Sequence, residues 1–107
     1  RQLDLLQRIT SVGKPIVLVV VSAGPVDISW AKEHVSAIVW AGYGGQSGGI
    51  AIVDALLGKI NPGGALPYTW YPQKHADLAP FWDMGMRPNT TTGNPGRSYR
   101  FLDTSIV

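Results

Sequence analysis

The stretch that decides the fold is Ile16-Val17-Leu18-Val19-Val20-Val21, six consecutive apolar residues of which five are β-branched. A strand with one face in solvent would alternate apolar and polar side chains, so this run predicts a central strand covered on both faces. Gly24 and Pro25 follow as turn residues. Residues 35–40 form a second apolar segment and predict another buried strand.

Two helices are predicted around the first strand. Apolar side chains recur at helical spacing over residues 2–11, and Gly13 follows as a stop signal. A shorter helix is predicted over residues 30–33, between the two strands. Its N-cap is expected to be Asp27 or Ser29, because a short polar side chain can accept a hydrogen bond from the first helical turn.

The second half of the chain continues this alternation with weaker signals. Residues 42–49 are a glycine-rich turn, and the apolar spacing over residues 50–57 predicts a helix after it. Residues 66–71 predict a short edge strand between prolines, and residues 98–102 predict a final strand. Alternating units with short connections favour an α/β layered sandwich, with a mostly parallel sheet flanked by helices.

The composition favours a folded core and disfavours several classes of partner. Hydrophobic residues make up 45% of the chain and charged residues 15%, as in globular proteins. The net charge of +2 comes from scattered residues, so we expect neither a nucleic acid nor a membrane as partner. No cysteine is present, which excludes disulfides and thiolate metal sites within these residues. The longest apolar run, residues 16–21, is far shorter than the roughly 20 residues of a membrane span.

The glycine-rich turn over residues 42–49 is the first candidate binding loop. Backbone amides between a strand and a helix can approach a phosphate group. The dinucleotide fingerprint, however, requires glycine where Ser47 stands, and the lysine of a P-loop is missing. Nucleotide binding is therefore the weakest of three interpretations. The other two are a loop that only packs a strand tightly against a helix and a loop that lines a sugar site.

Several motifs occur in an order and spacing typical of one enzyme family. The most specific are the glycine and glutamine loop 42–49, Asn61-Pro62-Gly63-Gly64, and Leu66-Pro67-Tyr68-Thr69-Trp70-Tyr71-Pro72. Matching segments also include residues 24–27, 54–58, 83–88 and 95–101. Over nearly its whole length, the chain resembles plant and fungal β-xylosidases of glycoside hydrolase family 3.

The resemblance implies that the chain, residues 1–107, is part of the C-terminal α/β sandwich domain of a longer polypeptide. The parent would be a retaining exo-glycosidase that removes terminal β-xylosyl residues from xylo-oligosaccharides, with α-arabinofuranosidase activity as a related option. Its N-terminal barrel domain, the expected partner of this chain, would supply an aspartate nucleophile. The closing segment of the sandwich domain is also expected to lie outside the chain.

No catalytic residue is assigned to this chain. Retaining glycosidases need two carboxyl groups about 5 to 5.5 Å apart, and the resemblance implies that both precede residue 1. The single glutamate, Glu33, is interpreted as a residue of a solvated helix face. His34 and His75 have no carboxylate pair nearby, so no metal or other cofactor is expected. A non-catalytic carbohydrate-binding or interaction remnant is the alternative function.

Substrate contacts are predicted for Tyr43, Gln46 and Asp27. The loops that carry these side chains follow the two strands, and open parallel sheets bind ligands at the carboxyl ends of their strands. We expect this edge of the sheet to face the barrel domain. Structural roles are the alternatives: Asp27 as a helix cap, Gln46 bonded to the first turn of the next helix, and Tyr43 filling a domain interface.

A glycosylation site is predicted at Asn89. Asn89-Thr90-Thr91 is an N-x-T acceptor within a stretch rich in proline, threonine and glycine, which we expect to be an exposed loop. Such tripeptides also arise by chance, so an unused motif is the alternative. The acceptor favours a secreted, extracellular protein of the cell wall.

Overall fold

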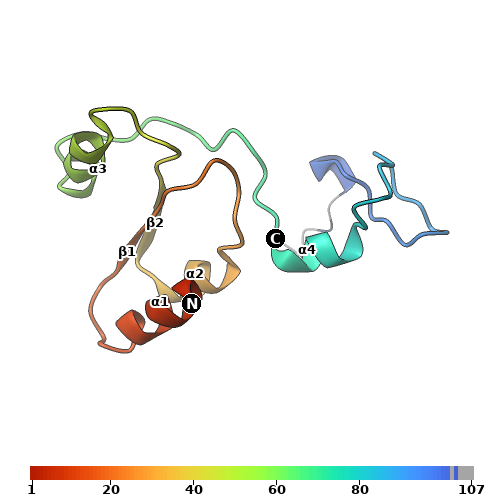
Figure 1. The fold of residues 1–107 in the computed structure, drawn as a ribbon, viewed down its shortest axis with the longest axis horizontal. Helices are drawn as coiled ribbons and strands as arrows, with labels where there is room; N and C mark the ends of the chain where they lie inside the picture. Colours follow the sequence, from red (N-terminus) through yellow and green to blue (C-terminus); the bar gives the residue numbers. More distant parts are fainter. Residues whose placement is uncertain (102, 104–107) are drawn as a thin grey trace. The chain divides into compact units, whose positions relative to one another are not determined.

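The computed structural model describes residues 1–101 and 103. The chain divides into two compact units, whose α-helices and strands are labelled in Figure 1. The first unit consists of Arg1–Gly24 and Ile28–Ala65. The second unit combines Pro25–Asp27 with the described residues from Leu66 onward.

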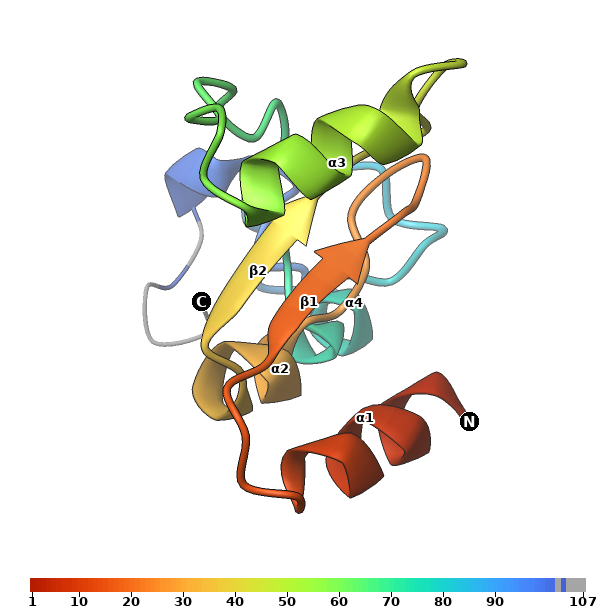
Figure 2. The same ribbon diagram turned by 90° about the vertical axis from the view of Figure 1, so that its left-hand side faces the viewer.

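The first unit contains every helix and strand predicted for it, in the predicted order. These elements are α1 (Gln2–Thr10), β1 (Val17–Val20), α2 (Ser29–His34), β2 (Ala37–Trp40) and α3 (Gly48–Leu56). The two strands run parallel, with Val17 opposite Ala37 and Val20 opposite Trp40. Figure 2 shows α3 beyond the carboxyl ends of both strands, with α1 and α2 toward their starts. The α/β class with parallel strands is therefore confirmed.

The predicted N-cap of α2 is wrong. Ile28 holds the N-cap position without a capping side chain, and Ser29 is already the first helical residue. Asp27 instead accepts a hydrogen bond from the backbone N–H of Gln73, at the start of another helix. The physical reason is that a carboxylate can accept from whichever helix end the folded chain brings near it.

The second unit contains little regular structure. Its elements are α4 (Gln73–Leu78), the 3-10 helix η1 (Tyr99–Phe101) and an isolated antiparallel bridge between Asn89 and Asn94. In the part of the chain that the structure describes, the sheet has only the strands β1 and β2.

Both strands predicted in the second unit are wrong. Residues 66–71 form no strand, because Pro67 lacks a backbone donor and no neighbouring strand is available within the described residues. Residues 99–101 turn instead, since Phe101 N–H bonds to the Ser98 carbonyl at 3.0 Å and Ser98 Oγ accepts from Arg100 N–H at 3.3 Å. Residue 102, the end of the second prediction, lies outside the described residues.

Few side chains are buried. Among the described residues, Ala31 is the only buried apolar side chain, while Leu5 of α1 is 60% exposed and Ile50 of α3 is 68% exposed. His75 and Asn94 are the buried polar side chains of the same residues. The buried side chains of the second unit are therefore polar, and we search for a site in this unit.

None of the described helices has the length and apolar character needed to cross a bilayer.

Candidate functional site

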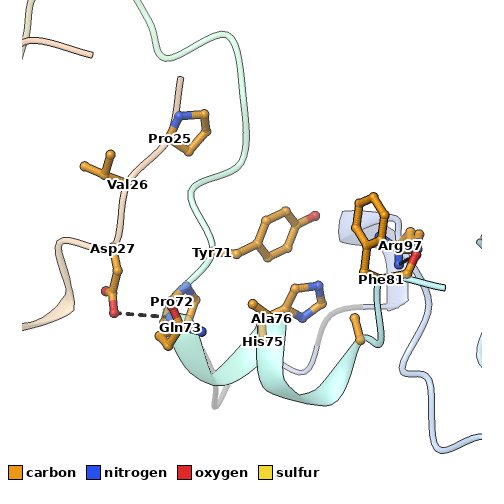
Figure 3. A pocket seen from close by; sticks show the side chains of 11 residues that line it. Pro25, Val26, Asp27, Tyr71, Pro72, Gln73, His75, Ala76, Phe81 and Arg97 are labelled. Carbon is orange, nitrogen blue, oxygen red and sulfur yellow. Dashed lines mark hydrogen bonds between the residues drawn. The ribbon is translucent and has the colours of Figure 1, made fainter. Parts of the chain in front are cut away.

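The second unit contains a cavity of about 480 Å³. One of the three predicted substrate residues, Asp27, lines it (Figure 3). The other polar and aromatic side chains in its wall are Tyr71, Gln73, His75, Phe81 and Arg97. The cavity is thus the candidate site, and the contacts of its wall show which of these groups are available to a ligand.

Asp27 joins a short extended segment to the start of α4. Its Oδ2 atom lies 3.2 Å from the backbone nitrogen of Gln73, the bond drawn as a dashed line in Figure 3. Pro72 holds the N-cap position of α4 and makes no side-chain bond to it. A carboxylate at a helix N-terminus satisfies an unpaired N–H group and interacts favourably with the helix dipole. Asp27 therefore acts as the cap of α4, supplied from a distant part of the sequence.

His75 forms the buried part of the cavity wall. The residue is 8% exposed, and its ring stacks on Tyr71 with centroids 4.3 Å apart and planes 19° from parallel. Burial, and secondarily the positive charge of Arg97, hold the pKa of His75 below its ordinary value of 6.5. Nδ1 is buried without a hydrogen-bond partner in the described residues. The imidazole is therefore neutral at neutral pH.

Arg97 fixes the neighbouring loop through its guanidinium group. Nη2 donates to the carbonyls of Pro80 at 2.5 Å and Phe81 at 3.1 Å, and Nε donates to the carbonyl of Asp83 at 2.7 Å. Charged donors of this kind make stronger bonds than neutral ones. Arg97 is thus committed largely to holding the backbone in place.

The described wall of the cavity does not contain the pair of carboxyl groups that a glycosidase uses. Asp27 carries the single carboxyl group among the described lining residues, so the two-carboxylate arrangement of a glycosidase is not formed here. Residues 1–101 and 103 also contain no cluster of three His, Cys, Asp or Glu side chains suited to a metal ion. The wall instead offers a carboxylate, a phenol and aromatic rings, groups that contact polar organic molecules.

Tyr43 and Gln46 lie in the first unit, in the loop between β2 and α3. Tyr43 is 75% exposed and Gln46 is also exposed. Ser47 is the N-cap of α3 and makes no side-chain cap bond. The substrate contact and the structural alternative for Gln46 both stay predictions.

The same loop is held in a tight turn by glycine. A Cβ atom on Gly44 would lie 2.8 Å from the Cα atom of Gly48, closer than atoms can approach. The N–H of Gly48 bonds to the carbonyl of Gly45 at 3.0 Å, which closes the turn. Tight strand-to-helix packing thus accounts for glycine at position 44. It does not account for the exposed side chains of Tyr43 and Gln46.

The two loops predicted to share an edge do begin at the same edge. Val20 pairs with Trp40 at the strand ends, and the N–H of Ala41 bonds to the Val20 carbonyl at 2.9 Å. Beyond the strands, Trp40 Nε1 donates to the carbonyl and Oγ atoms of Ser22 at 3.2 and 3.1 Å. Asp27 belongs to the second unit, so its grouping with Tyr43 and Gln46 stays a prediction.

Sequence reasoning missed the roles of Tyr71, His75 and Arg97. A usable signal existed for the first two, because aromatic residues four positions apart can stack at the start of a helix. Arg97 gave no such signal, since its partners are carbonyl groups of loop residues at separations of 14 to 17 positions.

A family model matches almost the whole chain. The model of the glycosyl hydrolase family 3 C-terminal domain covers residues 1–101. No solved structure matches the chain at a significant level.

Curated relatives match along the same length. The chain is 45% identical to a protein of Medicago sativa subsp. varia named beta-xylosidase/alpha-L-arabinofuranosidase 2, over 100% of the chain and 14% of the relative. It is 45% identical to beta-D-xylosidase 3 of Arabidopsis thaliana, with the same coverage. It is 46% identical to an exo-1,4-beta-xylosidase of Emericella nidulans, over 99% of the chain and 13% of the relative. The chain thus spans about one seventh of these relatives.

Proposed function

Because this chain belongs to the glycosyl hydrolase family 3 C-terminal domain family, we propose that its parent polypeptide is a retaining exo-glycosidase. Its substrates are xylo-oligosaccharides, from which it removes terminal β-xylosyl residues. The observation that carries this proposal is the match over residues 1–101 together with identity of about 45%, over the whole chain and 14% of each relative, to proteins named as β-xylosidases.

The chain itself contributes no catalytic carboxylate in this proposal. Retaining hydrolysis needs one ionised and one protonated carboxyl group about 5 to 5.5 Å apart, and the cavity wall has only Asp27 among its described residues. Glu33 is exposed on α2. The nucleophile and the acid/base group therefore come from other parts of the parent, with the barrel domain as partner.

Exposed apolar side chains support this division of labour. Leu5 of α1, Ile50 of α3 and the neighbouring Leu57 are 60%, 68% and 66% exposed. Apolar surface of this extent is favourable to bury, at about 25 cal/mol per Å². In the parent, these helices pack against other parts of the polypeptide.

The β2–α3 loop has a substrate-facing role in this proposal. Tyr43 and Gln46 present polar groups from a loop of small residues at the carboxyl end of a parallel strand. They bind the sugar and do not take part in bond cleavage. Asp27 contributes by positioning α4 at the cavity.

A second substrate class has its own support. Two of the relatives carry both activities in their names, β-xylosidase and α-L-arabinofuranosidase. We include terminal arabinofuranosyl residues as alternative substrates of the parent.

We also propose that the parent is secreted and acts in the cell wall.

The test uses nitrophenyl β-xyloside, α-arabinofuranoside and β-glucoside with the full-length parent. We expect hydrolysis of the xyloside, with the first product formed as the β-anomer in proton NMR, and weaker hydrolysis of the arabinofuranoside. An inverted first product would exclude the retaining mechanism. A parent that binds xylobiose without hydrolysing any of the three substrates would favour the non-catalytic alternative.

The inactivity of the chain alone is tested with the 107-residue polypeptide. We expect no turnover of any of the three substrates. Turnover that survives purification and disappears in Glu33→Gln would place a catalytic carboxylate within this chain and overturn the proposed division.

A further inference from the structure

Asn89 has the only N-x-T acceptor motif of the chain. The sequence contains three asparagines, and the other two, Asn61 and Asn94, are each followed by proline. Proline after the asparagine excludes the motif. Any N-linked glycan on this chain is therefore restricted to Asn89.

The structure presents this motif at the end of a narrow loop. Asn89 and Asn94 form an antiparallel bridge, with the Asn89 N–H bonded to the Asn94 carbonyl at 2.9 Å. Residues 90–93 make the turn between them. We call residues 89–93 the tip. Asn89, Thr90 and Thr91 are all exposed, so the three residues of the motif are accessible from solvent in the described unit.

Local hydrogen bonding leaves the reactive atom of Asn89 accessible. The side-chain oxygen Oδ1 accepts the N–H of Thr91 at 3.0 Å. The amide nitrogen Nδ2, the atom that carries an N-linked glycan, has no hydrogen-bond partner in the described residues. The side chain is thus oriented by its oxygen while its nitrogen remains available.

Asn94 pairs with Asn89 at the base of the tip, and its side chain is buried and bonded where that of Asn89 is exposed. Asn94 is 2% exposed, its Nδ2 donates to the carbonyls of Asp83 at 3.3 Å and Gly85 at 3.5 Å, and its Oδ1 accepts the Gly96 N–H at 2.9 Å. The two asparagines of one bridge therefore differ: Asn94 is buried and bonded through both Nδ2 and Oδ1, whereas Asn89 is exposed and bonded through Oδ1.

Asp83 adds a second anchor for the base. Its Oδ2 accepts the hydroxyl of Thr92 at 2.5 Å, and its Oδ1 accepts the Gly85 N–H at 3.0 Å. These bonds, that of Thr92 first, hold the pKa of Asp83 below its ordinary value. Thr92 thus ties the tip to Asp83, whereas Asn89, Thr90 and Thr91 of the same tip stay exposed.

We infer that Asn89 is N-glycosylated and that the tip faces solvent in the complete parent protein. In the modification, an N–H bond of Nδ2 is replaced by a bond to C1 of the first sugar. The donor is a polyprenyl diphosphate-linked oligosaccharide, whose diphosphate leaves with the bonding electrons while the amide proton passes to a base. A domain interface at the tip would exclude so bulky a group. The inference rests on the proposed secretion of the parent.

The test directs the full-length parent into the secretory pathway of a eukaryotic host with an added signal peptide. The purified protein is treated with peptide N-glycosidase in heavy-oxygen water and analysed by peptide mass spectrometry. We expect conversion of Asn89 to aspartate with incorporation of the heavy oxygen. Because secretion is imposed, an incorrect proposal about natural localisation cannot produce a negative result.

Two neighbouring threonines provide the matched control. Thr91→Ala removes the hydroxyl of the motif but keeps the backbone N–H that bonds to Asn89, and we expect it to abolish the modification. Thr90→Ala changes an equally exposed threonine at the variable position and is expected to leave it intact. Should Thr91→Ala fail to be secreted, Asn89→Gln replaces it.

Two results would overturn the inference. One is an unmodified Asn89 peptide from folded, secreted parent that hydrolyses its substrate. The other is modification that persists in Thr91→Ala. Activity is measured on the same samples, so failure of the proposed glycosidase function is recognised separately from failure of the glycosylation.

Discussion

The carboxylate of Asp27 accepts a hydrogen bond from the backbone N–H of Gln73 at 3.2 Å, across 46 positions of the chain. This bond satisfies the first turn of α4, whose N-cap Pro72 makes no side-chain bond to the helix. It also places Asp27 in the wall of the cavity. A structural role and a substrate contact for Asp27 therefore predict different consequences of mutation.

Asp27→Ala in the full-length parent is expected to lower the melting temperature, because loss of a helix cap costs about 0.5 to 2 kcal/mol. Asp27→Asn keeps an oxygen acceptor and should recover most of the stability. The value of kcat/KM, corrected for the folded fraction, should stay unchanged in both variants. A lowered kcat/KM with an unchanged melting temperature would instead make Asp27 a substrate contact.

Two glycines of the β2–α3 loop should respond differently to alanine. Gly44→Ala places a Cβ atom 2.8 Å from the Cα atom of Gly48 and forces the start of α3 to move, at a cost of about 1 to 3 kcal/mol. Gly45→Ala meets no atom within 4 Å and should change stability by less than about 0.5 kcal/mol. Thermal unfolding of both variants of the parent checks this. Equal melting temperatures would contradict the tight-turn interpretation.

His75 predicts a loss of stability on acidification. Its pKa is lowered in the folded state by burial and by Arg97, so the unfolded chain binds the proton more readily. The contribution of the neutral His75 ring to folding stability is therefore complete above pH 6.5, the ordinary pKa of histidine. This contribution is lost as the pH falls through the lower pKa that His75 has in the folded state. His75→Phe keeps an aromatic ring against Tyr71 and cannot titrate.

The measurement is the melting temperature of the parent as a function of pH, from neutral to mildly acidic. We expect a steeper decrease in the wild type than in His75→Phe. Asp83 should act in a more acidic range, below its ordinary value of 3.8, so the two effects separate along the pH axis. Parallel curves for wild type and His75→Phe would show that His75 does not contribute.

Tyr43→Phe and Gln46→Ala distinguish a sugar-binding loop from an interface. Loss of a hydrogen bond to the substrate removes about 1 to 3 kcal/mol of transition-state stabilisation, which lowers kcat/KM roughly 5-fold to 150-fold. The melting temperature then stays constant. If Tyr43 fills a domain interface instead, Tyr43→Phe lowers the melting temperature and leaves kcat/KM unchanged. Steady-state kinetics and thermal unfolding of the full-length variants decide the question, and unchanged kinetics in both would remove these residues from the proposed site.

Local patterns were sufficient for the first unit. Continuous β-branched apolar residues predict β1, helical spacing with glycine stops predicts α1 and α3, and short connections predict the parallel pairing that the structure confirms. The predictions failed where a partner was needed. Residues 66–71 have strand composition but no neighbouring strand within the described residues.

By itself, the sequence determined the family, the α/β class and the element order of the first unit, because these follow from side-chain types at short spacings. Tertiary structure alone decided which helix Asp27 caps, that His75 is buried against Tyr71, and that Asn94 is buried while Asn89 is exposed. Hydrogen-bond partners and burial depend on residues that are distant in the chain, and side-chain type does not specify which distant group comes near.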